Sequence, residues 1–150
     1  MSARDAKLVP FLAKYTPAIA ARAKAILARM RTRLPGAVEL VYDNYNALVI
    51  GFGPTDRASE AVFSIALYPR WVSLFFLQGA KLADPKKLLK GSGRQVRSIV
   101  LEDASVLDQP AVRALMAQAV KRAKPAIDAT ARRRLVVKSV SAKQRPRRPS

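Results

Sequence analysis

Residues 61–77, AVFSIALYPRWVSLFFL, decide the fold class of this 150-residue chain. Apolar residues alternate with small or polar ones on both sides of Pro69-Arg70, which is typical of two strands joined by a two-residue turn. With Tyr68 opposite Trp71, one face of this hairpin is entirely apolar, and it is predicted to be the core face. That face carries Phe63, Ile65, Leu67, Val72, Leu74 and Phe76.

Three more segments resemble the two strands of this hairpin, 61–68 and 71–77, in their β-branched and aromatic content: residues 37–43, 47–52 and 96–101. Most connections between the five segments are too short to hold a crossover helix, which a parallel pair of strands needs. The sequence therefore predicts a five-stranded, mostly antiparallel sheet.

Helical periodicity flanks the strands on both sides. Thr16 is a natural N-cap, Pro17 suits the first helical position, and apolar residues then recur at three- and four-residue spacing up to Leu34. A second amphipathic helix is predicted over 110–124, because its apolar residues also form one stripe. Two such helices suit one face of one sheet, which gives a two-layer α+β sandwich.

Two shorter helical segments complete the expected elements. Residues 7–14 have the composition of a helical turn that precedes the first long helix. Residues 84–91 begin with Asp-Pro and end with glycine, which predicts one short helix between the fourth and fifth strands.

Composition restricts the possible chemistry. The chain contains no cysteine and no histidine, which excludes disulfides, thiolate nucleophiles, imidazole-based triads and Cys/His zinc sites. No pair of carboxylates or activated serine stands out, so the sequence predicts a non-enzymatic protein with no catalytic residues, metal or cofactor. Residues 1–7 lead into no apolar run typical of a signal peptide, and no stretch approaches the ~20 apolar residues of a membrane span. A cytoplasmic location is expected.

Positive charge dominates the chain and is unevenly distributed. The formal net charge is +18, and residues 113–150 hold 12 basic residues against one acidic residue. We expect a folded domain over 1–125, a possible helical extension over 126–137 and a disordered basic tail over 138–150. The tail predicts weak, salt-sensitive binding to nucleic acid, with simple solubilisation as the alternative. Its cations are Lys138, Lys143, Arg145, Arg147 and Arg148.

Several ordered segments resemble a known family. These are Leu34-Pro-Gly with Glu39-Leu-Val-Tyr42, Ala66-Leu-Tyr-Pro69, and residues 87–97, KLLKGSGRQVR. Together they resemble the YdhG-like domain, a bacterial family of largely unknown function, over about Phe11–Lys124. The resemblance implies a frataxin-like fold and, because some members are proposed iron chaperones, a possible iron-handling role.

The acidic residues fit an iron site poorly. Frataxin-like iron binding, as the resemblance implies it, uses carboxylates gathered on the first helix, whereas residues 16–34 contain none. Local acidic groups elsewhere are interpreted as caps and solubilising charges. They are Asp56, Glu60, Glu102, Asp103 and Asp108.

The loop around Gly91 is the candidate anion site. Two glycines allow backbone N–H groups to turn toward an anion, and nearby cations can neutralise it. The alternative is that Gly91 ends a helix and the charges are solvated. The candidate residues are Lys87, Lys90, Gly91, Gly93, Arg94 and Arg97.

A second candidate is aromatic. On the sheet face opposite the core, Tyr68, Trp71 and Phe75 could form a platform for a planar ligand or unstacked bases, or a homodimer interface. The leading functional hypothesis is a binding domain for a small anionic ligand. An iron-handling protein and a homodimeric assembly module are the alternatives.

Overall fold

The computed structural model, which describes residues 2–150, contains the five expected strands within two residues of their expected bounds. They follow one another antiparallel, and the bounds are β1 (Val38–Asp43), β2 (Leu48–Gly53), β3 (Phe63–Leu67), β4 (Val72–Phe76) and β5 (Arg97–Val100). Leu67 pairs with Val72, and the Tyr68 N–H donates to the Trp71 carbonyl at 2.9 Å. The six side chains of the expected core face are fully buried, which confirms the predicted hairpin register.

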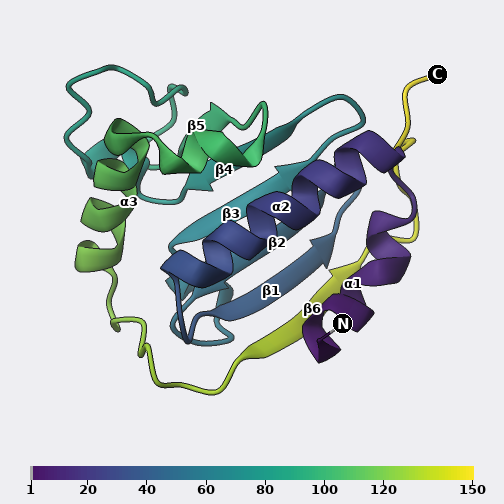
Figure 1. The fold of residues 1–150 in the computed structure, drawn as a ribbon, viewed down its shortest axis with the longest axis horizontal. Coiled ribbons are helices and arrows are strands. Elements are labelled where there is room, and N and C mark those ends of the chain that lie inside the picture. Colours follow the sequence, from purple (N-terminus) through teal and green to yellow (C-terminus); the bar gives the residue numbers. More distant parts are fainter. Residues whose placement is uncertain (1) are drawn as a thin grey trace.

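A sixth strand corrects the expected topology. β6 (Arg134–Val140) pairs parallel with β1, so the sheet is mixed and has the order β5-β4-β3-β2-β1-β6. Figure 1 shows the chain leaving α3 (Pro110–Arg122), crossing below the sheet and adding β6 at its far edge. The parallel pair is possible because α3 and the segment after it supply the long crossover that a short loop could not.

The C-terminal segment also differs from its expected state. Residues 134–137, part of the possible helical extension over 126–137, belong to β6, and the chain after β6 returns along the β1–β2 hairpin. There Ser141 N–H donates to the Asp43 carbonyl and Arg145 N–H to the Tyr45 carbonyl, both at 2.8 Å. Residues 138–150 therefore do not form a separate disordered tail. A polar basic segment can be ordered here because the folded domain provides its hydrogen-bonding partners.

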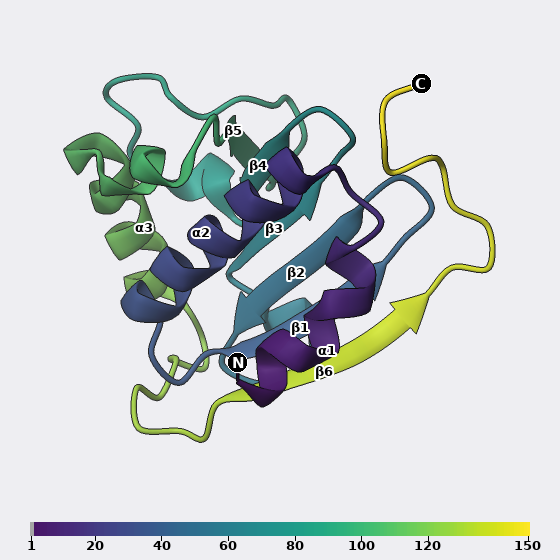
Figure 2. The ribbon, with the colours of Figure 1, turned by 45° about the vertical axis from the view of Figure 1, so that its right-hand side comes forward.

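The three helices gather on one side of the sheet (Figures 1 and 2). α1 (Ala3–Leu12) lies near β1 and β6, α2 (Pro17–Arg33) crosses the sheet, and α3 lies beyond α2 toward β4 and β5. The Thr16 hydroxyl accepts a hydrogen bond from the Ile19 N–H, as expected of an N-cap. The apolar stripes of all three helices are buried against the core face of the sheet, which confirms the α+β class.

Residues 84–91 do not form the expected helix. The Asp84 carboxylate accepts hydrogen bonds from the Leu88 and Leu89 N–H groups, each at 2.9 Å. Lys87 has a φ of +54°, a left-handed conformation that interrupts a right-handed helix. Lys90 then forms an antiparallel bridge with Ser98. The Asp-Pro start therefore caps a turn rather than a helix.

No helix within residues 2–150 has the length and apolar character needed to cross a membrane.

Candidate functional site

A groove lies at the end of the sheet where the β1–β2 and β3–β4 hairpins turn. It has a volume of about 590 Å³ and is open to solvent. One wall comes from the β3–β4 turn, with Tyr68, Arg70 and Trp71, and the other from residues 145–150. None of the ten residues that line it is acidic. Segments about 75 residues apart in the sequence thus build a single concave, positively charged surface.

The first wall presents a stacked aromatic pair. The rings of Tyr68 and Trp71 lie 4.5 Å apart at an angle of 17°. The two-residue turn explains this arrangement, because it brings the two positions opposite each other beyond the last paired residues of the strands. Trp71 remains 41% exposed, so much of this aromatic surface is open to a planar ligand.

The cations of the groove come from both walls. Arg70 and Arg145 are exposed, and the groove lining gives neither guanidinium an acidic side chain as a neighbour. Arg148 is exposed as well, although its Nε donates to the Lys14 carbonyl at 3.2 Å and its Nη2 to the Ala13 carbonyl at 3.3 Å. The groove therefore combines an aromatic surface with three guanidinium groups.

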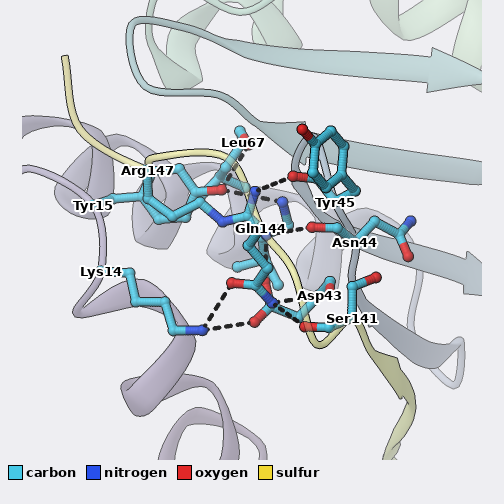
Figure 3. A network of polar contacts seen from close by, with 10 residues as sticks. Lys14, Tyr15, Asp43, Asn44, Tyr45, Leu67, Ser141, Gln144 and Arg147 are labelled. Carbon is cyan, nitrogen blue, oxygen red and sulfur yellow. Dashed lines mark hydrogen bonds and ion pairs between the residues drawn. The ribbon is translucent and has the colours of Figure 1, made fainter. Parts of the chain in front are cut away.

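Behind the second wall lies a buried ion pair, shown in Figure 3. The Arg147 side chain is only 4% exposed, and its Nη2 donates to Asp43 Oδ1 at 2.8 Å and to the Asn44 carbonyl at 2.5 Å. The other oxygen of Asp43 accepts a hydrogen bond from Lys14 Nζ at 2.9 Å. A buried charge is tolerated only when it is paired and hydrogen-bonded, and Asp43 has both kinds of partner.

The ionisation of Asp43 follows from these contacts. Burial raises the pKa of this carboxyl, but hydrogen bonds from Lys14, Gln144 and Arg147 outweigh burial and hold the pKa below its usual value. Asp43 is therefore ionised at neutral pH and keeps its attraction for the Arg147 guanidinium.

Tyr15 contacts the same region through its hydroxyl and its ring. Its hydroxyl donates to the Leu67 carbonyl at 2.8 Å and accepts from the Leu48 N–H at 3.1 Å, which ties the α1–α2 link to β2 and β3. Burial raises its pKa, so the phenol stays neutral. The Arg147 guanidinium lies 6.0 Å from the centre of the Tyr15 ring, within reach of a cation–π contact.

The expected anion site around Gly91 does not contribute to the groove. Arg97 Nη1 donates to the Gly93 carbonyl at 2.6 Å and to the Val96 carbonyl at 2.8 Å, so this guanidinium is hydrogen-bonded to the backbone of its own loop. Gly91 has a positive φ of +127°, but it does not end the predicted helix, because residues 84–91 form no helix. Lys87, Lys90 and Arg94 are exposed side chains of the same loop, and none of them lines the groove.

Of the five local acidic residues, Glu102 is exposed, and the other four have structural partners. Asp108 pairs with Arg29 at 3.0 Å and with Arg33 at 2.5 Å, and Asp56 lies 3.4 Å from Arg134. Glu60 accepts a hydrogen bond from the Thr55 hydroxyl, while Asp103 caps the turn at 104–108. Across residues 2–150, no three acidic side chains gather in an arrangement that could hold a metal ion.

The expected aromatic platform is divided. Tyr68 and Trp71 stack in the groove, whereas the half-buried Phe75 lies opposite Ser64 and Ser98 within the sheet and does not line the groove. Arg70 was not predicted as a neighbour of this pair, although its place in the two-residue turn was a usable signal. The burial of Arg147 was not predicted either, and the sequence holds no local signal for it.

No family model, curated protein or solved structure matches this chain.

Proposed function

We propose that this protein binds single-stranded nucleic acid in the groove between the β3–β4 turn and the C-terminal segment. The observation that carries the proposal is the Tyr68–Trp71 stack, with Trp71 exposed, in a groove whose other wall contains Arg145 and Arg148. Proteins that bind single strands combine a positively charged groove with aromatic side chains on which bases stack. The proposal describes a binding protein and not an enzyme.

Electrostatics favours this class of ligand. A net charge of +18 attracts any polyanion, and the arginines of the groove direct the backbone phosphates to one place. Each phosphate neutralised on a single strand contributes about −0.7 to the slope of log affinity against log salt, so Arg70, Arg145 and Arg148 account for a slope of roughly −2.

The aromatic pair favours single strands over duplexes. A base can stack on an indole only when it is unpaired and turned out of its own helix, and stacking contributes about 1–3 kcal/mol per base. A duplex offers its phosphates to the arginines but no free base face to Trp71. The groove therefore predicts a preference for single strands above the general attraction of a basic protein for polyanions.

The test is a binding isotherm of the full chain with a labelled oligothymidine of about 12 nucleotides and with a duplex of equal length. Trp71→Ala should weaken single-strand binding by about 5- to 150-fold and duplex binding little, while Trp71→Phe should retain most of the affinity. Because Trp71 is the single tryptophan of the chain, quenching of its fluorescence reports binding at the groove in the wild type.

Matched charge variants complete the test. Arg145→Gln should weaken binding more than Arg133→Gln, which removes the same charge from an exposed side chain outside the groove. Equal single-strand affinities of the wild type and Trp71→Ala would refute the proposal. Thermal-shift arms with inorganic phosphate and Fe²⁺ address the alternatives, a small anion at the Gly91 loop and the iron handling implied by the YdhG-like resemblance.

A further inference from the structure

The second wall of the groove depends on how the C-terminal segment is held. Residues 141–150 include no buried apolar residue, and Arg147 is their one buried side chain. A segment of this composition cannot order itself, because it buries too little apolar surface to offset its conformational entropy. Its position must therefore come from contacts with the folded domain.

Arg148 contacts the Lys14 and Ala13 carbonyls, and the other contacts gather at the end of β1. Ser141 N–H donates to the Asp43 carbonyl and Arg145 N–H to the Tyr45 carbonyl. Between them, Gln144 Nε2 donates to the Asp43 carbonyl at 3.2 Å, and Gln144 Oε1 accepts from Lys14 Nζ at 3.1 Å. Each of these is an ordinary polar contact that water can replace at the surface.

Arg147 differs from these contacts in burial and charge. Its guanidinium lies against Asp43, the Asn44 carbonyl and the Tyr15 ring, and its two sequence neighbours, Pro146 and Arg148, both line the groove. The side chain thus points away from the groove into the domain, while the backbone on either side forms the wall. Figure 3 shows the guanidinium and Asp43 at the centre of this network.

We infer that the Arg147–Asp43 ion pair is the latch that positions residues 145–148 as the second wall of the groove, and that Arg147 is a positioning residue for nucleic-acid binding. The inference rests on the proposed function. With the latch open, residues 145–148 leave the groove, so the phosphate contacts of Arg145 and Arg148 are lost without any change to the aromatic wall.

Asp43→Asn distinguishes the latch from electrostatics alone, because the two predict opposite changes in single-strand affinity. The substitution raises the net charge by one, so electrostatics alone would tighten binding to a polyanion. The latch predicts weaker binding, because the buried Arg147 guanidinium would then have no negative partner and the segment would leave its site. We expect a several-fold loss of single-strand affinity and a salt slope smaller by about 1.4.

Arg147→Gln is the second variant, since it removes the buried cation and leaves Asp43 paired with Lys14. It should show the same reduced slope, whereas the matched Arg133→Gln should change the slope little. Hydrogen exchange separates positioning from general stability: amides of 141–148 should exchange faster in Arg147→Gln while those of β2 and β3 stay protected.

The outcomes distinguish the two proposals. If Trp71→Ala weakens binding but both latch variants bind with the wild-type affinity and slope, the latch is refuted and the proposed function stands. Tighter binding by Asp43→Asn would also refute the latch. If Trp71→Ala binds like the wild type, the proposed function fails. Exchange in 141–148 then still shows whether Arg147 anchors the segment.

Discussion

Two acidic residues on β1, Glu39 and Asp43, face the helices rather than solvent. Each is 1% exposed, and each is neutralised by basic side chains from other elements of the fold. Glu39 accepts hydrogen bonds from Arg4 of α1 and Arg31 of α2, at 2.5 and 2.9 Å. Some basic residues of the helices therefore neutralise buried carboxylates, although in the sequence they resemble a solvent-exposed helix face. This role accounts for part of the large number of basic residues in the chain.

Asp5 extends the Glu39 cluster and makes stability depend on pH. The hydrogen bond from Arg31, with a second from Ser2, lowers the pKa of Asp5 from 3.8 to about 2. A lowered folded-state pKa stabilises the protein above the unfolded pKa, and this stabilisation is lost as the pH falls through the folded value. The wild type should therefore exceed Asp5→Asn in free energy of unfolding at about pH 6, and the difference should shrink between about pH 4 and pH 2.

Denaturant titrations of both proteins across this pH range measure the difference. A gap that stays constant down to about pH 2 would show that the Asp5 carboxylate contributes nothing through its charge.

Leu74 tests the core face of the sheet. It is fully buried in β4 between the helices and the sheet, so Leu74→Ala removes packed apolar volume and leaves a cavity. The expected loss is about 2–5 kcal/mol in the free energy of unfolding, measured by urea denaturation. A loss below about 0.5 kcal/mol, typical of surface positions, would contradict the assigned face.

At the scale of elements, periodicity predicted the strands that pair with their neighbours in sequence. It did not predict the strand whose partner is distant in sequence. The β3–β4 hairpin follows from its own sequence, because a two-residue turn fixes its register. β6 pairs with β1 across about 95 residues, and nothing in Leu135-Val-Val137 alone distinguishes a strand from the end of a helix. The prediction of a helix over 84–91 was wrong for a different reason, since an Asp-Pro start suits a capped turn as well as a helix.

Leu135 tests whether β6 belongs to the cooperative fold. Its side chain is buried in the common core, whereas Val140 at the end of the same strand is 56% exposed. Leu135→Ala should lower the free energy of unfolding by about 2–5 kcal/mol. Val140→Ala should change it by less than about 0.5 kcal/mol. Equal, small effects of the two substitutions would place β6 outside the folding unit.

At the scale of the whole molecule, charge acts on stability and binding in opposite directions. A net charge of +18 makes the compact state repel itself, and the ion pairs at the surface offset only part of this. Raising salt from about 50 to 200 mM screens this repulsion and should raise the melting temperature. The same change should weaken binding of the single strand.

Thermal melts and isotherms at the two salt concentrations check this pair of trends. A melting temperature that falls with salt would indicate that attractive ion pairs, such as those of Asp43 and Glu39, outweigh the repulsion.

The sequence by itself determined the α+β class, the five antiparallel strands, the two long helices and the Tyr68–Trp71 pairing. These features depend on contacts between near neighbours along the chain, which periodicity and turn residues specify directly. The tertiary structure alone decided the parallel β6, the buried partners of Glu39 and Asp43, and the groove. β6 and the groove join segments far apart in sequence, and the burial of a charged side chain depends on how the elements pack. The sequence does not distinguish the buried Arg147 from the exposed arginines beside it. Its role depends on the one carboxylate that the fold places against it.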